Sequence, residues 1–233
     1  MTRLVLFDID GTLLSARGAP RRAFERAMVE VYGTAGPVAT HTFDGKTDPQ
    51  IARELLLLSG LDDPAIDAGL PDLWRRYTRR LRIELAAPAH ETVVLPGVHA
   101  LLNALEALDG RVVLGLLTGN IEAGAAMKLD SARIRTRFRV GAFGSDCERR
   151  DGLPQVAVDR ARALTGRTFH AREIVVIGDT PHDVTCGRAL DVHAVAVATG
   201  RHDVAALREA GAHAVFGDLS DTAAVMEAVL GAS

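Results

Sequence analysis

The sequence predicts an α/β fold in which a doubly wound parallel sheet carries an all-helical insert. Two patterns support this prediction. Over most of the 233 residues, short apolar runs alternate with amphipathic segments, which is typical of buried parallel strands and the helices that cover them. The alternation stops between about residues 16 and 92, where only helical patterns occur.

Each predicted strand is a short run rich in leucine or β-branched residues and bounded by polar residues or glycine. The strands are expected at residues 4–7, 112–117, 174–177, 192–197 and 214–216, with a weaker sixth at 140–143. Apolar residues recur at helical spacing between these runs, and Pro96 and Gly97 open the first such segment. The remaining core helices are expected near residues 122–132, 154–164, 181–190 and 219–230.

The insert contains three helical patterns. They cover residues 20–32, a segment that starts at Thr47 or Asp48 and stops at Gly60, and residues 71–86. Because the insert separates the first two strands of the core, residues 1–15 and 93–233 are expected to form the core domain. Residues 16–92 are expected to form a helical cap, with joints near residues 15–17 and 93–96.

Composition limits the classes of function. The chain is 48% hydrophobic and 24% charged, and its net charge of −3 gives no electrostatic reason to expect nucleic acid or an anionic membrane as partner. No stretch approaches the roughly 20 apolar residues of a membrane span, and the N-terminal apolar run is too short for a signal peptide. Cys147 and Cys186 lack metal-ligand spacing. We therefore expect a soluble, cytoplasmic protein with reduced thiols.

Two clusters of residues that could take part in catalysis or binding follow the first and second predicted strands. Asp8 and Asp10 are separated by one residue and followed by Gly11, which permits a tight turn. Alone, this pattern also fits a fragment of a calcium loop or a polar turn. Thr118 and Gly119 end the second strand before a helix, where they could hold a phosphate oxygen or simply cap the helix.

Two further clusters lie later in the chain. Asp179 follows a buried strand, and Asp183 lies four residues further on, so both acids could approach a cation held by Asp8. They could equally stabilise the start of the next helix. Arg149 and Arg150 precede another helix, where an arginine could neutralise a phosphoryl group or belong to a solvated run of charges.

Taken together, the four clusters resemble the motifs of the haloacid dehalogenase superfamily. Those motifs are Asp-x-Asp-Gly-Thr, a strand-terminal Thr or Ser, a Lys or Arg, and Gly-Asp-x-x-x-Asp, in the order found here. The match extends through the whole core, so the resemblance implies a Rossmann-like sheet, and the insert resembles the C1 cap of the family. Within the family, the arrangement is most similar to that of phosphoglycolate phosphatases.

The resemblance implies a role for each matching residue. Asp8 would be the nucleophile that forms an aspartyl-phosphate, and Asp10 the general acid for the leaving alcohol and then the base for water. Mg²⁺ would be held by Asp8, Asp179 and the main-chain carbonyl of Asp10. Asp183 would orient a basic group or a water. The substrate phosphate would be bound by Gly11, Thr118, Gly119, Asn120 and Arg150.

The third motif departs from the family pattern, which usually has a lysine there. The chain contains only two lysines, Lys46 and Lys128, and neither follows the expected spacing. Arg150 is therefore the candidate, with Arg149 next, since arginine keeps the charge and adds a bidentate fork. Lys128 is the alternative, but it lies about eight residues, roughly 12 Å, along the helix after Thr118. It is expected at the surface.

The aspartate at position 10 favours a phosphatase over a dehalogenase, because a halide leaves without a proton whereas an alcohol needs one. A sugar-phosphate mutase similar to β-phosphoglucomutase would share all four motifs and stays an alternative. A non-catalytic phosphate-binding domain is a third, but it would have no need of both Asp8 and Asp10.

The cap is expected to select a small phosphomonoester. Residues 41–48 form the candidate specificity loop, in which Lys46 suits a carboxylate or a second phosphate, although an exposed turn explains the same residues. The histidines are scattered without ligand spacing. No catalytic role is assigned to them, including His182, which is close to the site in sequence.

Overall fold

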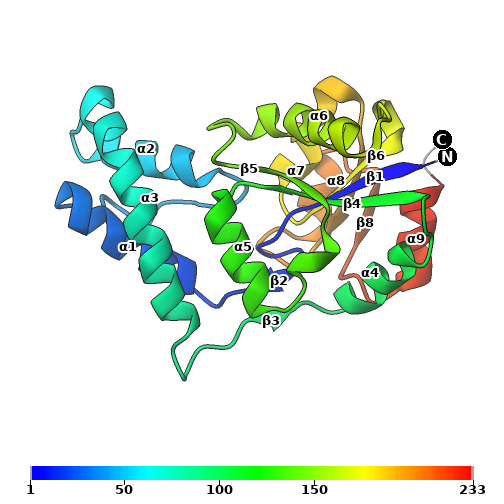
Figure 1. Cartoon of the computed structure of the whole chain (residues 1–233), viewed down its shortest axis with the longest axis horizontal. Coiled ribbons are helices and arrows are strands. Elements are labelled where there is room, and N and C mark those ends of the chain that lie inside the picture. The colour runs from blue at the N-terminus through cyan, green and yellow to red at the C-terminus, as the bar shows by residue number, and fades with distance from the viewer. Residues whose placement is uncertain (1, 232–233) are drawn as a thin grey trace.

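The computed structural model describes residues 2–231, and its centre is a six-stranded sheet (Figure 1). The strand order is β5-β4-β1-β6-β7-β8, and every neighbouring pair is parallel. The strands are β1 Arg3–Phe7, β4 Val112–Thr118, β5 Val140–Phe143, β6 Ile174–Gly178, β7 His193–Val197 and β8 Ala214–Phe216. The predicted α/β class is confirmed, and the weaker sixth candidate is the strand β5 at one edge.

Helices cover both faces of the sheet, as the alternation of the sequence predicted (Figure 1). On β1, Val5 and Phe7 face one hydrophobic cluster with α4, α5 and α9, whereas Leu4 and Leu6 face another with α6 and α7. Side chains alternate between the faces of a strand, so both sides of β1 are buried. The core helices are α4 Val98–Glu106, α5 Glu122–Ser131, α6 Leu153–Thr165, α7 Pro181–Cys186, α8 Val204–Glu209 and α9 Thr222–Leu230.

The insert is helical, and its three helices bury a hydrophobic cluster of their own. The helices are α1 Ala19–Tyr32, α2 Asp48–Leu58 and α3 Asp63–Leu85. The chain leaves and rejoins the core through β2 Leu14–Ser15 and β3 Val93–Val94, which pair antiparallel. In Figure 1 the three helices project to one side of the sheet. The division into domains at residues 15/16 and 92/93 stays a prediction.

Several predicted helix boundaries were wrong. Helix α3 begins at Asp63 rather than at residue 71, and Pro71 lies inside it. Proline is common in the first turn of a helix, and that signal is carried here by Pro64, after the N-cap Asp62, whose side chain accepts from the Ala65 N–H. Helix α8 was not predicted because its six residues are too few for a periodic pattern. Helix α7 is four residues shorter than expected and ends at Cys186.

Two smaller expectations concern the thiols and the membrane. Cys147 and Cys186 are both free thiols, as predicted. Within residues 2–231, no helix combines the length and the apolar character that crossing a bilayer requires.

His193 begins β7, at the edge of the sheet opposite to the carboxyl ends of the strands, and is 8% exposed. Burial and the nearby charges of His213, Arg172 and Arg3 together lower the pKa of His193 from 6.5 to about 4. The unfolded chain therefore binds a proton below pH 6.5 that the folded protein excludes until about pH 4. The contribution of His193 to the free energy of unfolding is therefore expected to fall by about 1–2 kcal/mol as the pH drops through this window.

Urea unfolding at pH 7 and pH 5 measures this effect. His193→Phe removes the titrating group, so the free energy of unfolding at pH 5, relative to that at pH 7, should be higher in the variant than in wild type. The prediction fails if wild type and variant lose the same free energy of unfolding between pH 7 and pH 5.

Candidate active site

The ends of three neighbouring strands build the site. Strands β4, β1 and β6 are adjacent and parallel, so their carboxyl ends meet at one edge of the sheet, where open α/β folds bind ligands. Thr118 is the last residue of β4, Asp8 follows β1, and Asp179 follows β6. The Asp8 N–H donates to the Ile177 carbonyl at 2.9 Å, which extends the sheet into the site.

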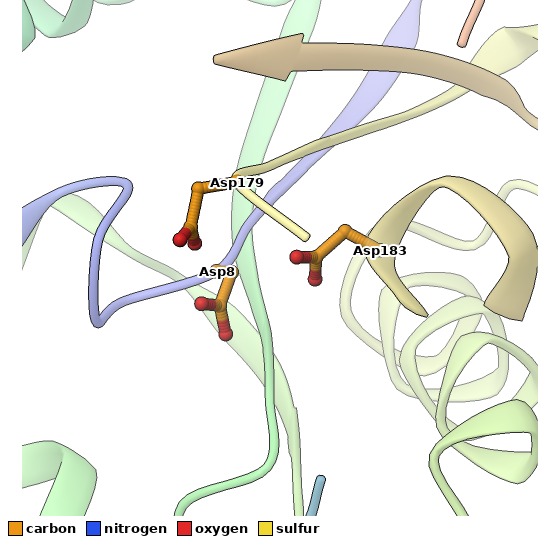
Figure 2. Close-up of side chains that lie close together, drawn as sticks. All are labelled: Asp8, Asp179 and Asp183. Atoms are coloured by element: carbon orange, nitrogen blue, oxygen red, sulfur yellow. The ribbon is translucent and has the colours of Figure 1, made fainter. Parts of the chain in front are cut away.

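Three buried carboxylates converge at this edge. Asp8, Asp179 and Asp183 approach from β1, β6 and α7 (Figure 2), and each offers one oxygen within 4.8 Å of the others. The backbone is packed closely around them. Gly11 has φ +82°, and a β-carbon there or at Gly200 would overlap the Asp179 carboxylate. Gly11 therefore shapes the loop and leaves room for the acid.

Negative charge in the cluster is only partly neutralised. Burial, opposed by Arg150 and assisted by Asp183 and Asp10, raises the pKa of Asp8 to about 7. Burial likewise raises the pKa of Asp179 to about 9, helped by Asp183 and Asp8. A divalent cation would relieve this repulsion, and carboxylate oxygens are the ligands that Mg²⁺ prefers. The donor set of Asp8 and Asp179 therefore fits Mg²⁺.

Arg150 is the cation that the structure places inside the cluster. Its side chain is 6% exposed, and its Nη2 lies 3.0 Å from Asp8 Oδ1 and also hydrogen-bonds to Asp183. Burial opposes the charge, but the carboxylates of Asp183 and Asp8 hold the pKa of Arg150 above its ordinary value. Arg149, the other candidate, is 81% exposed and pairs with Asp151.

Asp183 is held firmly in this arrangement. Its Oδ2 accepts hydrogen bonds from the Thr180 N–H at 2.9 Å and from the Thr180 hydroxyl at 2.7 Å. Its Oδ1 accepts from Arg150. The side chain thereby closes the first turn of α7 and fixes Arg150 next to Asp8.

The second predicted cluster forms a polar network around Asp10. The Asn120 Nδ2 donates to Thr118 Oγ1 at 2.7 Å and to Asp10 Oδ2 at 2.8 Å. Thr118 is fully buried. A β-carbon at Gly119 would overlap the backbone of Lys46, so the insert approaches the strand end closely there.

The expectation that Lys128 lies at the surface was wrong. Lys128 is 3% exposed, and its Nζ lies 2.6 Å from Asp10 Oδ2 and 2.5 Å from Asn120 Oδ1. The expectation considered only the distance along α5. Side chains on a helix point back toward its N-terminus, and a long lysine therefore reaches the loop of Asp10.

Residues of the insert complete the site. Lys46 lines the cavity, but its Nζ is paired with Glu54 Oε2 at 2.5 Å. Thr47 is the N-cap of α2, and Asp48 accepts from the Ile121 N–H of the core at 2.9 Å. Burial raises the pKa of Asp48 to about 6, although Lys128 and the Ile121 N–H oppose the shift.

A cavity of about 430 Å³ lies between the core and the insert. All the catalytic and phosphate-binding positions proposed from the sequence line it except Asp183, which is buried behind Arg150. The insert contributes aromatic and basic side chains. They are Arg17, Arg21, Phe24, Phe43, Lys46 and Tyr77.

The family described as haloacid dehalogenase-like hydrolase matches residues 5–197. The chain belongs to this family. The predicted family and the prediction of a hydrolase are thereby confirmed.

Curated relatives of this hydrolase are named phosphoglycolate phosphatases. One from Pseudomonas savastanoi pv. phaseolicola is 28% identical over 228 residues, covering 94% of this chain and 78% of the relative. One from Rhodospirillum rubrum is 29% identical over 223 residues, covering 94% and 89%.

Solved structures share the fold of this hydrolase. A hydrolase from Pseudomonas syringae superposes with a TM-score of 0.72 at 19% identity, covering 97% of this chain and 98% of the other. A candidate β-phosphoglucomutase from Bacteroides vulgatus superposes with a TM-score of 0.71 at 18% identity, covering 99% and 90%.

Sequence reasoning missed several residues around the site of this hydrolase. Tyr77 is 1% exposed and lines the cavity. In the sequence it lies on an apolar helical stripe, so a role in the helix core was sufficient to explain it. Thr12 donates to Asp179 Oδ1 at 3.2 Å. Thr12 belongs to the first motif, and its hydroxyl group next to the two acids is the sequence feature that could have identified it. Arg201 lies in a loop with no pattern to mark it and reaches the cavity from the far end of the chain.

Proposed function

We propose that this hydrolase is a Mg²⁺-dependent phosphatase that cleaves a small phosphomonoester through an aspartyl-phosphate on Asp8. One observation carries the proposal. Asp8, a buried carboxylate with a raised pKa, lies next to a buried guanidinium and a second acid, Asp179, and it lines the cavity between the core and the insert. This arrangement provides a nucleophile, a phosphate-binding cation and a place for a divalent metal ion.

In the first half of the reaction, an Asp8 oxygen attacks phosphorus and the bond to the leaving oxygen breaks. Asp10 gives that oxygen a proton, and Arg150 neutralises charge on the transferred group. Asp8, Asp179 and the main-chain carbonyl of Asp10 would hold Mg²⁺, which would supply positive charge that offsets the repulsion between the nucleophile and the phosphate. In the second half, Asp10 takes a proton from the water that hydrolyses the aspartyl-phosphate.

Other residues hold the transferred group and its partners. The Thr118 hydroxyl and the Gly119 amide bind phosphate oxygens, while Gly11 lets the loop turn beneath the phosphate and Asn120 anchors Asp10. Asp183 positions Arg150, as its hydrogen bond to that guanidinium supports. The helices of residues 16–92 act as a cap over the substrate.

The substrate is a small phosphorylated metabolite resembling phosphoglycolate. The names of the curated relatives support this class, since their similarity extends over 94% of the chain. The cavity volume of about 430 Å³ accommodates such a molecule. Lys46 and the arginines of the insert provide positive charge near a carboxylate, although Glu54 offsets that of Lys46.

Phosphate release from a panel of small phosphomonoesters tests the proposal. With Mg²⁺ present, at least one ester, with 2-phosphoglycolate as the first choice, is expected to release inorganic phosphate. Excess EDTA should abolish the release, and added Mg²⁺ should restore it. Undiminished release in EDTA would contradict the metal requirement. Isomerisation of glucose 1-phosphate with little phosphate release would instead identify a mutase.

A further inference from the structure

Lys128 carries a second buried ammonium or guanidinium charge at the site, and it contacts Asp10 rather than the proposed nucleophile. It extends from α5, and its side chain is 4% exposed. Its Nζ lies 2.6 Å from Asp10 Oδ2 and 2.5 Å from Asn120 Oδ1. Both acceptors are side chains that face the cavity rather than parts of the scaffold.

Because the Lys128 ammonium is buried, its partners must compensate the loss of water around the charge. An ammonium removed from water is strongly destabilising unless charge and hydrogen bonds compensate it. The neighbouring Ala125 and Leu129 of α5 pack into the hydrophobic core, so the ammonium group of Lys128 depends on polar partners at the site. The compensation comes from Asp10 and Asn120, which connects Lys128 to the chemistry of the site.

The two oxygens of Asp10 are used differently. Oδ2 receives both the Lys128 ammonium and the Asn120 amide. Within residues 2–231, Oδ1 accepts no hydrogen bond, and the Asp10 side chain is 44% exposed to the cavity. One oxygen is therefore anchored, and the other is left for the substrate.

We propose that Lys128 is a positioning residue for proton transfer by Asp10, a role that rests on the proposed phosphatase function. When the Asp8 oxygen bonds to phosphorus and the bond to the leaving oxygen breaks, the proton passes from Asp10 Oδ1 to that oxygen. When water attacks, Oδ1 takes a proton back. Oδ2 stays an acceptor for Lys128 and Asn120 in both states, so the carboxyl group keeps its orientation throughout the cycle.

The test compares two esters of similar size in the presence of Mg²⁺. Benzyl phosphate releases a strongly basic alkoxide that needs a proton, whereas 4-nitrophenyl phosphate releases a weakly basic phenolate that does not. The ratio kcat/KM reports the steps through cleavage of the ester bond. Lys128→Met should lower kcat/KM for benzyl phosphate about 10- to 100-fold more than for 4-nitrophenyl phosphate. Asp10→Asn should show the same preference more strongly.

Two further variants separate positioning from folding. Lys128→Arg keeps the cation and should recover part of the benzyl phosphate activity. If Lys128→Met does not fold, as judged by circular dichroism, Asn120→Ala removes the other donor to Oδ2 and should shift the ratio of the two esters in the same direction.

The matched control is Lys46→Met, the same substitution at the only other lysine of the chain. Lys46 pairs with Glu54, so any loss should be equal for the two esters. Equal losses in Lys128→Met would overturn the positioning role while the phosphatase function stands. A folded wild type that hydrolyses neither these esters nor any of the metabolite panel would overturn the function and, with it, this role.

Discussion

Replacing Asp8 by asparagine is expected to lower phosphate release about 10⁴-fold or more while leaving the protein folded. The amide is a poor nucleophile, and no described residue other than Asp8 and Asp179 offers a carboxylate beside Arg150 that also lines the cavity. The variant is assayed with the best ester of the panel, under saturating Mg²⁺, and phosphate release is followed over time.

The same substitution should not reduce thermal stability in metal-free buffer. The folded environment raises the pKa of Asp8 to about 7 through burial and the neighbouring Asp183 and Asp10, so the ionised carboxylate is less stable there than in the unfolded chain. Asparagine removes this repulsion and keeps the shape. The loss of activity can then be assigned to chemistry rather than to unfolding.

Asp130→Asn serves as the matched control for Asp8→Asn. Asp130 lies on α5 with its side chain 57% exposed and paired with Arg135, so its substitution should leave turnover unchanged. Undiminished turnover in Asp8→Asn would show that Asp8 is not the nucleophile. A large drop in the melting temperature would instead indicate that the carboxylate is structurally required.

The sequence predicted the framework of the site well because that framework depends on short-range patterns. Buried runs at residues 4–7, 112–117 and 174–177 marked three strands, and parallel pairing then brings their carboxyl ends to one edge. The acids that follow the strands had to meet there. No side-chain detail was needed for Asp8, Asp179 and Thr118 to be expected together.

Contacts that depend on the path of a loop or the direction of a side chain were harder to predict from the sequence. The distance along α5 separated Lys128 from Thr118, yet the loop of Asp10 passes beside the helix, and the lysine reaches it. Asp48 was expected as a helix cap or as part of the specificity loop, whereas its carboxylate accepts a hydrogen bond from the Ile121 N–H of the core. Both errors have the same cause, because periodicity places a residue on an element without placing that element against its neighbours.

Substitution of Arg150 tests whether this arginine occupies the position at which the third motif of the family usually has a lysine. Arg150→Met leaves two buried acids, Asp8 and Asp183, without their cation. Breaking a buried ion pair in this way destabilises a protein by about 3–5 kcal/mol, and the phosphate loses its guanidinium. Urea unfolding in EDTA should show the loss of stability, and phosphate release should fall by at least about 100-fold.

Arg149→Met is the matched control, with the same substitution one residue earlier. Arg149 is 81% exposed and pairs only with the exposed Asp151 among the described residues, so the free energy of unfolding should change by no more than about 0.5 kcal/mol. Mg²⁺ bound at the proposed site of Asp8 and Asp179 would replace part of the missing charge, so added Mg²⁺ should raise the stability of Arg150→Met more than that of wild type. If Arg149→Met is the variant that loses activity, the third motif lies one residue earlier than the geometry of the acid cluster indicates.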